Sequence, residues 1–224
     1  MSRILALFFL FVVCGLGAAA QSASPTMSIV EDDGTETEEV SYEGSAPLQV
    51  IFRANASDYD DYNVYYHWTF TNDDTEEVFL TRYDEETTYT FSQSGSYTIE
   101  LTVTFIAGTD TVEYTMDDPF TITITESKLE VPNAFTPNGD GVNDVFRVKE
   151  GYESILSFKA AVFNRWGKKL YEWTDIEGGW DGTSGGKDVP DGAYYLVINA
   201  QGADGINYKI KKVINVLRGY TESE

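Results

Sequence analysis

The chain has 224 residues, a single cysteine, a single histidine and a formal net charge of −22 at pH 7. With one histidine and no cysteine beyond position 14, thiolate catalysis and cysteine–histidine zinc clusters are excluded. Residues 21–126 hold 23 acidic residues against two basic ones, whereas residues 127–224 hold 14 against 12, an asymmetry that indicates two domains. The acidic half would repel phosphate backbones and anionic headgroups, so nucleic-acid binding and direct membrane insertion are not expected.

Residues 1–20 have the composition of a cleaved signal peptide. Arg3 supplies the positive charge, residues 4–13 are apolar, and three alanines at 18–20 suit signal peptidase. The apolar run is shorter than the ~18 residues that indicate a membrane span. A lipoprotein is the alternative, but Val13 stands before Cys14, where a small residue is expected. We therefore expect an exported chain that begins at Gln21 and is kept soluble by its negative surface.

Alternating apolar and polar residues predict antiparallel strands throughout the first half. Every odd position from 97 to 105 is apolar and every even one polar, and residues 120–124 alternate in the same way. Leu48, Val50 and Phe52 indicate an earlier strand. Because the strands are short and no long helix is expected, the sequence predicts an all-β fold of two consecutive Ig-like antiparallel β-sandwich domains, divided at residues 126 and 127.

The first domain resembles PKD-type Ig-like domains in two segments. Residues 88–91 followed by 95–101 are similar to the closing hairpin of that family, and residues 66–70 stand where it has a core aromatic strand. After Trp68 the chain departs from the family, because residues 69–74 lack the two glycines of the usual turn. The resemblance therefore implies the fold, but not the tight turn or a role for the family's aspartates.

Aromatic residues gather between positions 59 and 68 of the first domain. Alternation predicts that Tyr66 and Trp68 are buried, with Tyr65 and His67 on the opposite face. Tyrosines interspersed with aspartates suit a protein partner or the stacking of sugar rings, although tyrosine is also an ordinary strand residue. The residues expected to contact a partner are Tyr59, Tyr62 and Tyr65.

The second domain shows a series of hairpins. Strands are expected at 158–163 and 170–173, joined by a turn in which Gly167 supplies a positive φ. Residues 190–192 (Pro-Asp-Gly) predict another turn, and residues 194–198, apolar on both faces, predict a strand in the middle of the sandwich. The final strand, 208–217, places Lys209 and Lys211 opposite Tyr208 and Ile210.

Four motifs of this domain occur in a specific order. They are residues 131–144 (VPNAFTPNGDGVND), 163–167 (FNRWG), 179–183 (GWDGT) and 189–195 (VPDGAYY). The series closely resembles the gliding-motility-associated C-terminal domain, the type B sorting domain of the type IX secretion system. The resemblance implies a non-enzymatic exported protein of the cell surface or outer membrane, whose sorting domain docks on the type IX translocon and a PorP/SprF-type outer-membrane barrel.

The first domain would then be a protein-interaction module. The alternatives are a structural adaptor that links the barrel to another envelope component, and a surface adhesin that binds glycans. No catalytic residues are expected, since no Ser-His-Asp set, carboxylate pair or phosphate loop has positional support.

The first motif contains a candidate Ca²⁺ loop. Alternate oxygen ligands followed by a turn glycine, Gly141, are what a hard multi-coordinate cation requires, although Arg147 replaces the acid at the twelfth position. The alternative is a turn whose side chains bond their own backbone. The expected metal ligands are Thr136, Asn138, Asp140, Val142 and Asp144.

Trp166 and Trp180 each stand beside a turn glycine. Covering the end or edge of a sandwich is the commoner role of such a tryptophan, and a ligand platform is the alternative. In the second domain we expect partner contacts at Trp166, Lys209 and Lys211.

Overall fold

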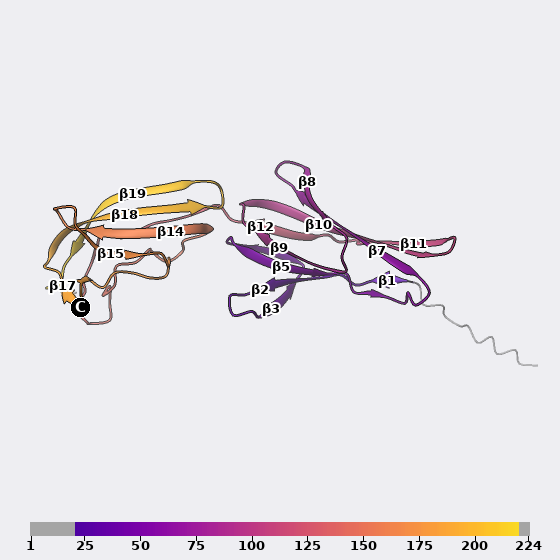
Figure 1. Cartoon of the computed structure of the whole chain (residues 1–224), viewed down its shortest axis with the longest axis horizontal. Coiled ribbons are helices and arrows are strands. Elements are labelled where there is room, and N and C mark those ends of the chain that lie inside the picture. The colour runs from indigo at the N-terminus through magenta and orange to yellow at the C-terminus, as the bar shows by residue number, and fades with distance from the viewer. Residues whose placement is uncertain (1–20, 220–224) are drawn as a thin grey trace, which may run out of the picture.

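The computed structural model describes residues 21–219, so the expected signal peptide lies outside the described residues. The described chain is all-β and forms two domains arranged end to end (Figure 1), as the sequence predicts. Within residues 21–219 there is no helix of the length and apolar character that a membrane crossing needs. The strands are β1 (Ser22–Ala23), β2 (Thr26–Val30), β3 (Glu36–Glu39), β4 (Ser41–Gly44), β5 (Leu48–Arg53), β6 (Ala56–Ser57), β7 (Asn63–Asn72), β8 (Glu77–Arg82), β9 (Glu86–Phe91), β10 (Gly95–Ala107), β11 (Asp110–Thr115), β12 (Phe120–Ile124), β13 (Ala134–Phe135), β14 (Ile155–Phe163), β15 (Lys169–Trp173), β16 (Thr183–Ser184), β17 (Lys187–Asp188), β18 (Gly192–Gly202) and β19 (Asn207–Val216).

The first domain is a sandwich of two sheets. One has the strand order β3-β2-β5-β9, and the other has the order β4-β12-β10-β7-β8 with β11 also paired to β10. The odd residues of β10 from Tyr97 to Phe105 are buried, which confirms the predicted alternation. Phe52 from one sheet packs on Trp68 and Phe70 from the other, with ring centroids 5.8 and 5.3 Å apart. The core therefore lies between the two sheets, with the predicted aromatic strand β7 on one side of it.

The predicted hairpin between residues 88–91 and 95–101 is wrong. β9 pairs with β5 in one sheet, whereas β10 pairs with β7, β11 and β12 in the other. The chain crosses between the sheets at a corner where the Tyr97 hydroxyl donates a hydrogen bond of 2.9 Å to the carbonyl of Gln93. This is a tyrosine corner of Ig-like sandwiches. Gly95 fits it with φ +144 and Asp74 Oδ2 only 2.6 Å from where a Cβ would stand.

The second domain is built on one five-stranded sheet, with the order β13-β19-β18-β14-β15. Its inner face is covered by irregular chain and by the small hairpin β16–β17, so this covering layer contains few strand pairs. Gly167 has φ +79 in the turn between β14 and β15, as predicted. Lys209 and Lys211 are exposed on the outward face of β19, also as predicted.

The expectation that residues 194–198 form a strand in the middle of the sandwich is wrong. β18 is the central strand, and Tyr194, Leu196 and Ile198 are buried on its inner side. Tyr195 on the outer side is 49 % exposed, because among the described residues no second layer covers that face of the sheet. An apolar strand in the middle of a sheet therefore need not be in the middle of a sandwich.

The two domains meet through a polar junction. Ser154 of the second domain is 1 % exposed, and its Oγ accepts a hydrogen bond of 3.1 Å from the amide of Ala46 in the first. Its carbonyl accepts the amide of Ala203, in the β18–β19 turn, at 2.9 Å. Ala203 in turn packs into the core cluster of the first domain and accepts the amide of Ser94 at 3.2 Å. The β18–β19 turn therefore docks on the base of the first domain.

Candidate functional site

The four motifs meet at the end of the second domain that faces away from the junction. β14 and β18 pair Ile155 with Gly202 beside the first domain, and Phe163 with Tyr195 at the far end. The third motif joins the chain two residues after the first motif, through a bridge in which Phe146 and Trp180 exchange amide-to-carbonyl bonds of 2.8 and 2.9 Å. We call this end, formed by residues 131–146, 163–167, 179–183 and 189–195 with Arg218, the distal end.

Aromatic rings from three motifs pack together inside the distal end. Trp180 is fully buried, with ring centroids 5.4 Å from both Phe135 and Tyr194. Its indole nitrogen donates to the carbonyl of Thr183 at 2.7 Å. The Tyr194 hydroxyl donates to the carbonyl of Pro190 at 2.7 Å, which forms a second tyrosine corner like that of Tyr97. Trp180 is therefore a core residue and cannot serve as a surface platform.

Arg218 joins the motifs to one another, a role that no pattern in the sequence predicts. Its Nη1 donates to the carbonyl of Pro137 at 2.7 Å, and its Nη2 donates to that of Gly182 at 2.6 Å. Nη2 also lies 3.2 Å from the carboxylate of Asp188. Gly182 has φ +78, and a Cβ there would stand 2.8 Å from Nη2, so a larger residue would displace the guanidinium. We call these contacts of Arg218 the arginine clamp; they link the first motif to the third just beyond β19.

The candidate Ca²⁺ loop is folded by its own hydrogen bonds. The two carboxylate oxygens of Asp144 accept the amides of Gly139 and Gly141 at 2.7 and 2.8 Å, which holds the pKa of Asp144 below its ordinary value. Asp140 accepts the amide of Val142 at 2.8 Å. Within residues 21–219 no three His, Cys, Asp or Glu side chains cluster as a metal site would require.

The remaining expected ligands also belong to this network. Asn138 Oδ1 accepts the amide of Asp140 at 3.0 Å, and Thr136 Oγ1 donates to the carbonyl of Val142 at 3.2 Å. Each carboxylate oxygen of Asp140 and Asp144 that accepts an amide keeps a second lone pair, so these two side chains can still bind a cation. Calcium binding stays a prediction, and the hydrogen bonds explain how the loop keeps its shape without a metal.

Trp166 is the most exposed aromatic residue of the motifs. Its side chain is 75 % exposed at the tip of the β14–β15 turn, where Asn164 Oδ1 accepts the amides of Trp166 and Lys168 at 3.0 Å. The guanidinium of Arg165 lies 4.3 Å from the centre of the indole ring, a cation–π arrangement that restrains both side chains.

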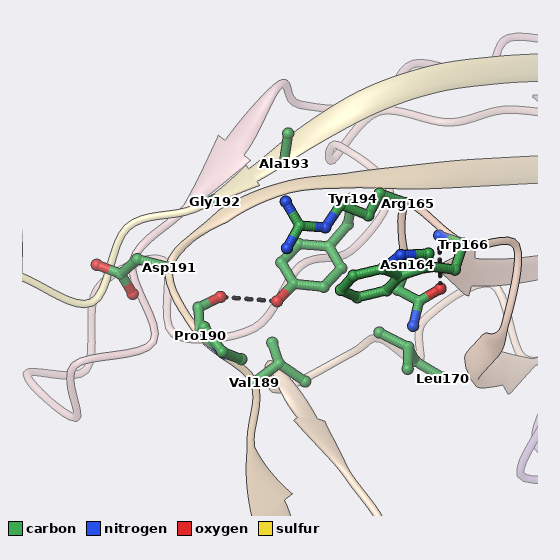
Figure 2. Close-up of a pocket in the computed structure, with 10 residues that line it drawn as sticks. All are labelled: Asn164, Arg165, Trp166, Leu170, Val189, Pro190, Asp191, Gly192, Ala193 and Tyr194. Atoms are coloured by element: carbon green, nitrogen blue, oxygen red, sulfur yellow. Dashed lines mark hydrogen bonds between the residues drawn. The ribbon is translucent and has the colours of Figure 1, made fainter.

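Beside Trp166 lies a groove of about 320 Å³ (Figure 2). Its apolar wall comes from Leu170, Val189, Pro190 and Tyr194, and Asp191 stands at the opposite end from Trp166. Asp191 accepts the amide of Arg218 at 3.1 Å, so the groove and the arginine clamp share a wall. This combination of an exposed indole, an arginine and an apolar groove can bind a protein side chain, but it offers no nucleophile or acid–base pair.

The other residues expected to contact a partner do not join this site. Lys209 and Lys211 lie on the outward face of the sheet, and Lys209 is six residues from Asn215, or about 20 Å along β19. In the first domain the three tyrosines separate. Tyr59 and Tyr62 pack against the core, and the Tyr62 hydroxyl donates to Asp110 at 2.6 Å, whereas Tyr65 is 58 % exposed on the outer face of β7.

The comparison with protein families finds one match in each half of the chain. Residues 129–215 match the model of the CHU_C type IX secretion signal domain, and residues 37–117 match that of the PKD domain. The second domain is a type IX secretion signal domain, and the first is a PKD domain. No curated protein matches the chain.

Three solved structures resemble the chain only weakly. Dimeric latent PorU from Porphyromonas gingivalis is 14% identical over 90% of this chain, with a TM-score of 0.28, and the chain spans 20% of its length. A tetra-tandem repeat from the extending region of a large adhesion protein is 13% identical, with a TM-score of 0.29. The match covers 90% of this chain and 68% of the repeat structure. A mixed-linkage glucan locus protein of Bacteroides ovatus, SGBP-B in complex with a heptasaccharide, is 13% identical over 79% of this chain and 42% of its own, with a TM-score of 0.25.

The secretion signal domain establishes the export route of the protein. The protein is exported through the type IX secretion system to the cell surface or the medium. Both matched domains are non-catalytic, and no catalytic domain is identified.

Proposed function

We propose that the protein is a non-enzymatic component of the cell surface, and that its secretion signal domain docks through the distal end on an outer-membrane barrel of the PorP/SprF type. The observation that carries this proposal is the exposure of Trp166. Phe135, Trp180 and Tyr194 of the motifs are buried in the core and Tyr195 is 49 % exposed on the outer face of the sheet, whereas the indole of Trp166 is 75 % exposed beside an apolar groove. An exposed indole leaves apolar surface in water, which is unfavourable, and contact with a partner would remove that surface from water.

The chemistry of the distal end suits a protein partner. Tryptophan and arginine are the residues that most often dominate binding energy at protein interfaces, and here Arg165 and Trp166 already stack on each other. Because the asparagine-capped turn fixes this pair, little side-chain freedom is lost when it is bound. The groove beside it would receive an apolar side chain of the barrel.

Lys209 and Lys211 have a different part in the proposed complex. Lys209 lies about 20 Å and Lys211 about 13 Å from Asn215 along β19, so a partner that covers Trp166 reaches them only with a second region of its surface. Exposed lysines at such a distance increase the rate of association more than they increase affinity. The first domain is then displayed as an interaction module, in an adaptor or an adhesin, at a position fixed by the Ser154 junction.

A localisation assay tests the docking site. Trp166→Ala and Arg165→Glu are expected to leave the protein folded but to reduce the share that a protease can reach on the surface of intact cells. Tyr83→Ala is the matched control, because Tyr83 is an aromatic residue of the first domain with similar exposure, 67 %. Equal surface display of the Trp166 variant, the Arg165 variant and the wild type would rule out the distal end as the docking site.

A further inference from the structure

The outer face of the first domain carries a patch that the secretion signal does not explain. Across β7, β10 and β11 the pairing places Tyr65, Thr104 and Glu113 in one row, and His67, Thr102 and Thr115 in the next. Glu100 follows on β10, in the row of Thr69. Residues directly opposite one another in antiparallel strands share a face. We call Tyr65, His67, Tyr83, Glu100 and Glu113 the outer patch, with Thr102 and Thr104 as its floor.

The aromatic side of the outer patch consists of exposed rings. Tyr65 is 58 % exposed and Tyr83 is 67 % exposed. The Tyr83 ring stacks on His67 at 5.3 Å and 6° between planes, which covers one face of the tyrosine. Among residues 21–219 neither tyrosine has a further ring contact, so each offers an open π face to a ligand.

The acidic side of the outer patch has no counter-charge. Among the described residues no basic group lies within ion-pair distance of Glu100 or Glu113. Residues 21–126 contain only two arginine or lysine side chains, and the one histidine, His67, belongs to the patch itself. Arg53 pairs with Glu36 and Glu86 at 2.8 and 2.7 Å on the other sheet, and Arg82 is opposite Trp68, which faces inward. A cationic group brought to the patch would therefore meet carboxylates that nothing else neutralises.

We propose that the outer patch binds a basic segment of another protein. An arginine or lysine side chain of that segment lies on the threonine floor, with its cation over Tyr65 or Tyr83 and its charge facing Glu113 or Glu100. Aromatic faces attract cations, and arginine also stacks on them, so arginine is preferred over lysine. Tyr65 and Glu113 are two strands apart, roughly 10 Å, a gap that one long side chain fills. The charge of −21 on this domain speeds the encounter and rejects anionic ligands.

A fluorescent twelve-residue peptide of alternating arginine and glycine tests the proposal by anisotropy, with residues 21–224 as the receptor at about 150 mM salt. Tyr65→Ala and Tyr83→Ala should each raise the Kd about 2- to 5-fold. Glu113→Gln should raise it by more than Glu38→Gln, the matched control, which removes the same charge from the exposed strand β3 of the same domain. Trp166→Ala should bind the peptide as the wild type does, which separates this site from the docking site.

Three outcomes would overturn the proposal. Equal weakening by Glu113→Gln and Glu38→Gln, with no effect of the tyrosine variants, would show diffuse attraction by net charge. Binding of a neutral glucan heptasaccharide that Tyr65→Ala abolishes, without arginine-peptide binding, would make the patch a sugar platform. Sedimentation velocity that finds a dimer lost in Tyr65→Ala would assign the patch to a second copy of the chain. Since each altered side chain is exposed, unchanged melting temperatures are expected and would exclude misfolding.

Discussion

Replacing Arg218 with methionine removes the guanidinium but keeps an apolar stem of similar length. The carbonyls of Pro137 and Gly182 then lose bonds of 2.7 and 2.6 Å from a charged donor whose side chain is only 24 % exposed. Hydrogen bonds to charged groups contribute about 1.5–3 kcal/mol each, and water will replace part of that loss. The contact with Asp188, whose side chain is 70 % exposed, adds little. We expect the second domain to lose roughly 2–4 kcal/mol, or on the order of 10–20 °C in Tm.

Tryptophan fluorescence during heating measures this loss, because Trp166, Trp173 and Trp180 report on the second domain and Trp68 on the first. Arg147→Met is the matched control, since it removes the same charge from an exposed position. A Tm for Arg218→Met equal to that of Arg147→Met would refute the claim that the arginine clamp holds the distal end together.

Three further predictions concern the same domain. Gly192 has φ +139 with open space around it, so Gly192→Val should cost about 1–3 kcal/mol through backbone strain alone, and a melt no lower than that of the neighbouring Ala193→Val would contradict this. The amides of Gly139 and Gly141 lower the folded-state pKa of Asp144, so its stabilising contribution is complete above its ordinary pKa of 3.8 and is lost as the pH falls through the lowered value. The stability gap between wild type and Asp144→Asn, measured by urea denaturation, should therefore be constant from about pH 7 to 5 and close at lower pH; a gap that does not change with pH would contradict the assignment. If the loop with Asn138, Asp140 and Asp144 binds calcium, the domain should be about 1 kcal/mol more stable in millimolar calcium than in chelator. Magnesium should stabilise it less, and Asp140→Ala should abolish the gain. Identical melting curves in calcium and in chelator would show that the loop is a turn that binds no calcium.

Local patterns predicted what depends on neighbours in the sequence. The alternation in residues 97–105 requires only a half-buried strand, and β10 confirms it. Gly167 and Gly192 were predictable because few other residues accept a positive φ. The motif spacing identified the second domain without any knowledge of its contacts.

The errors arose where burial is decided by distant segments. A strand, a short loop and a second strand predict a hairpin, but the Tyr97 corner sends β9 and β10 into different sheets. The signal was present, since a glycine two residues before a tyrosine occurs both at Gly95 and at Gly192 and marks a corner in each domain. No local pattern could reveal Arg218, because its partners lie 36 and 81 residues away in the sequence.

Trp166 and Trp180 show the same limit. Each precedes or follows a turn glycine, and the sequence alone does not distinguish them. Trp180 is buried because Phe135 and Tyr194 close over it, whereas the turn capped by Asn164 holds Trp166 away from the sheet. Tyr59, Tyr62 and Tyr65 are close in sequence, but only Tyr65 belongs to the outer face of the sandwich.

The most direct test of the central claim transfers the secretion signal domain to an unrelated protein. A reporter that follows residues 1–20 is expressed in a cell with an active type IX system, with and without residues 127–224 at its C-terminus. With those residues the reporter should be cut by protease added to intact cells, and without them it should remain protected in the periplasm. A folded fusion that stays protected, or a reporter that reaches the surface without residues 127–224, would contradict the assignment of the address to the second domain.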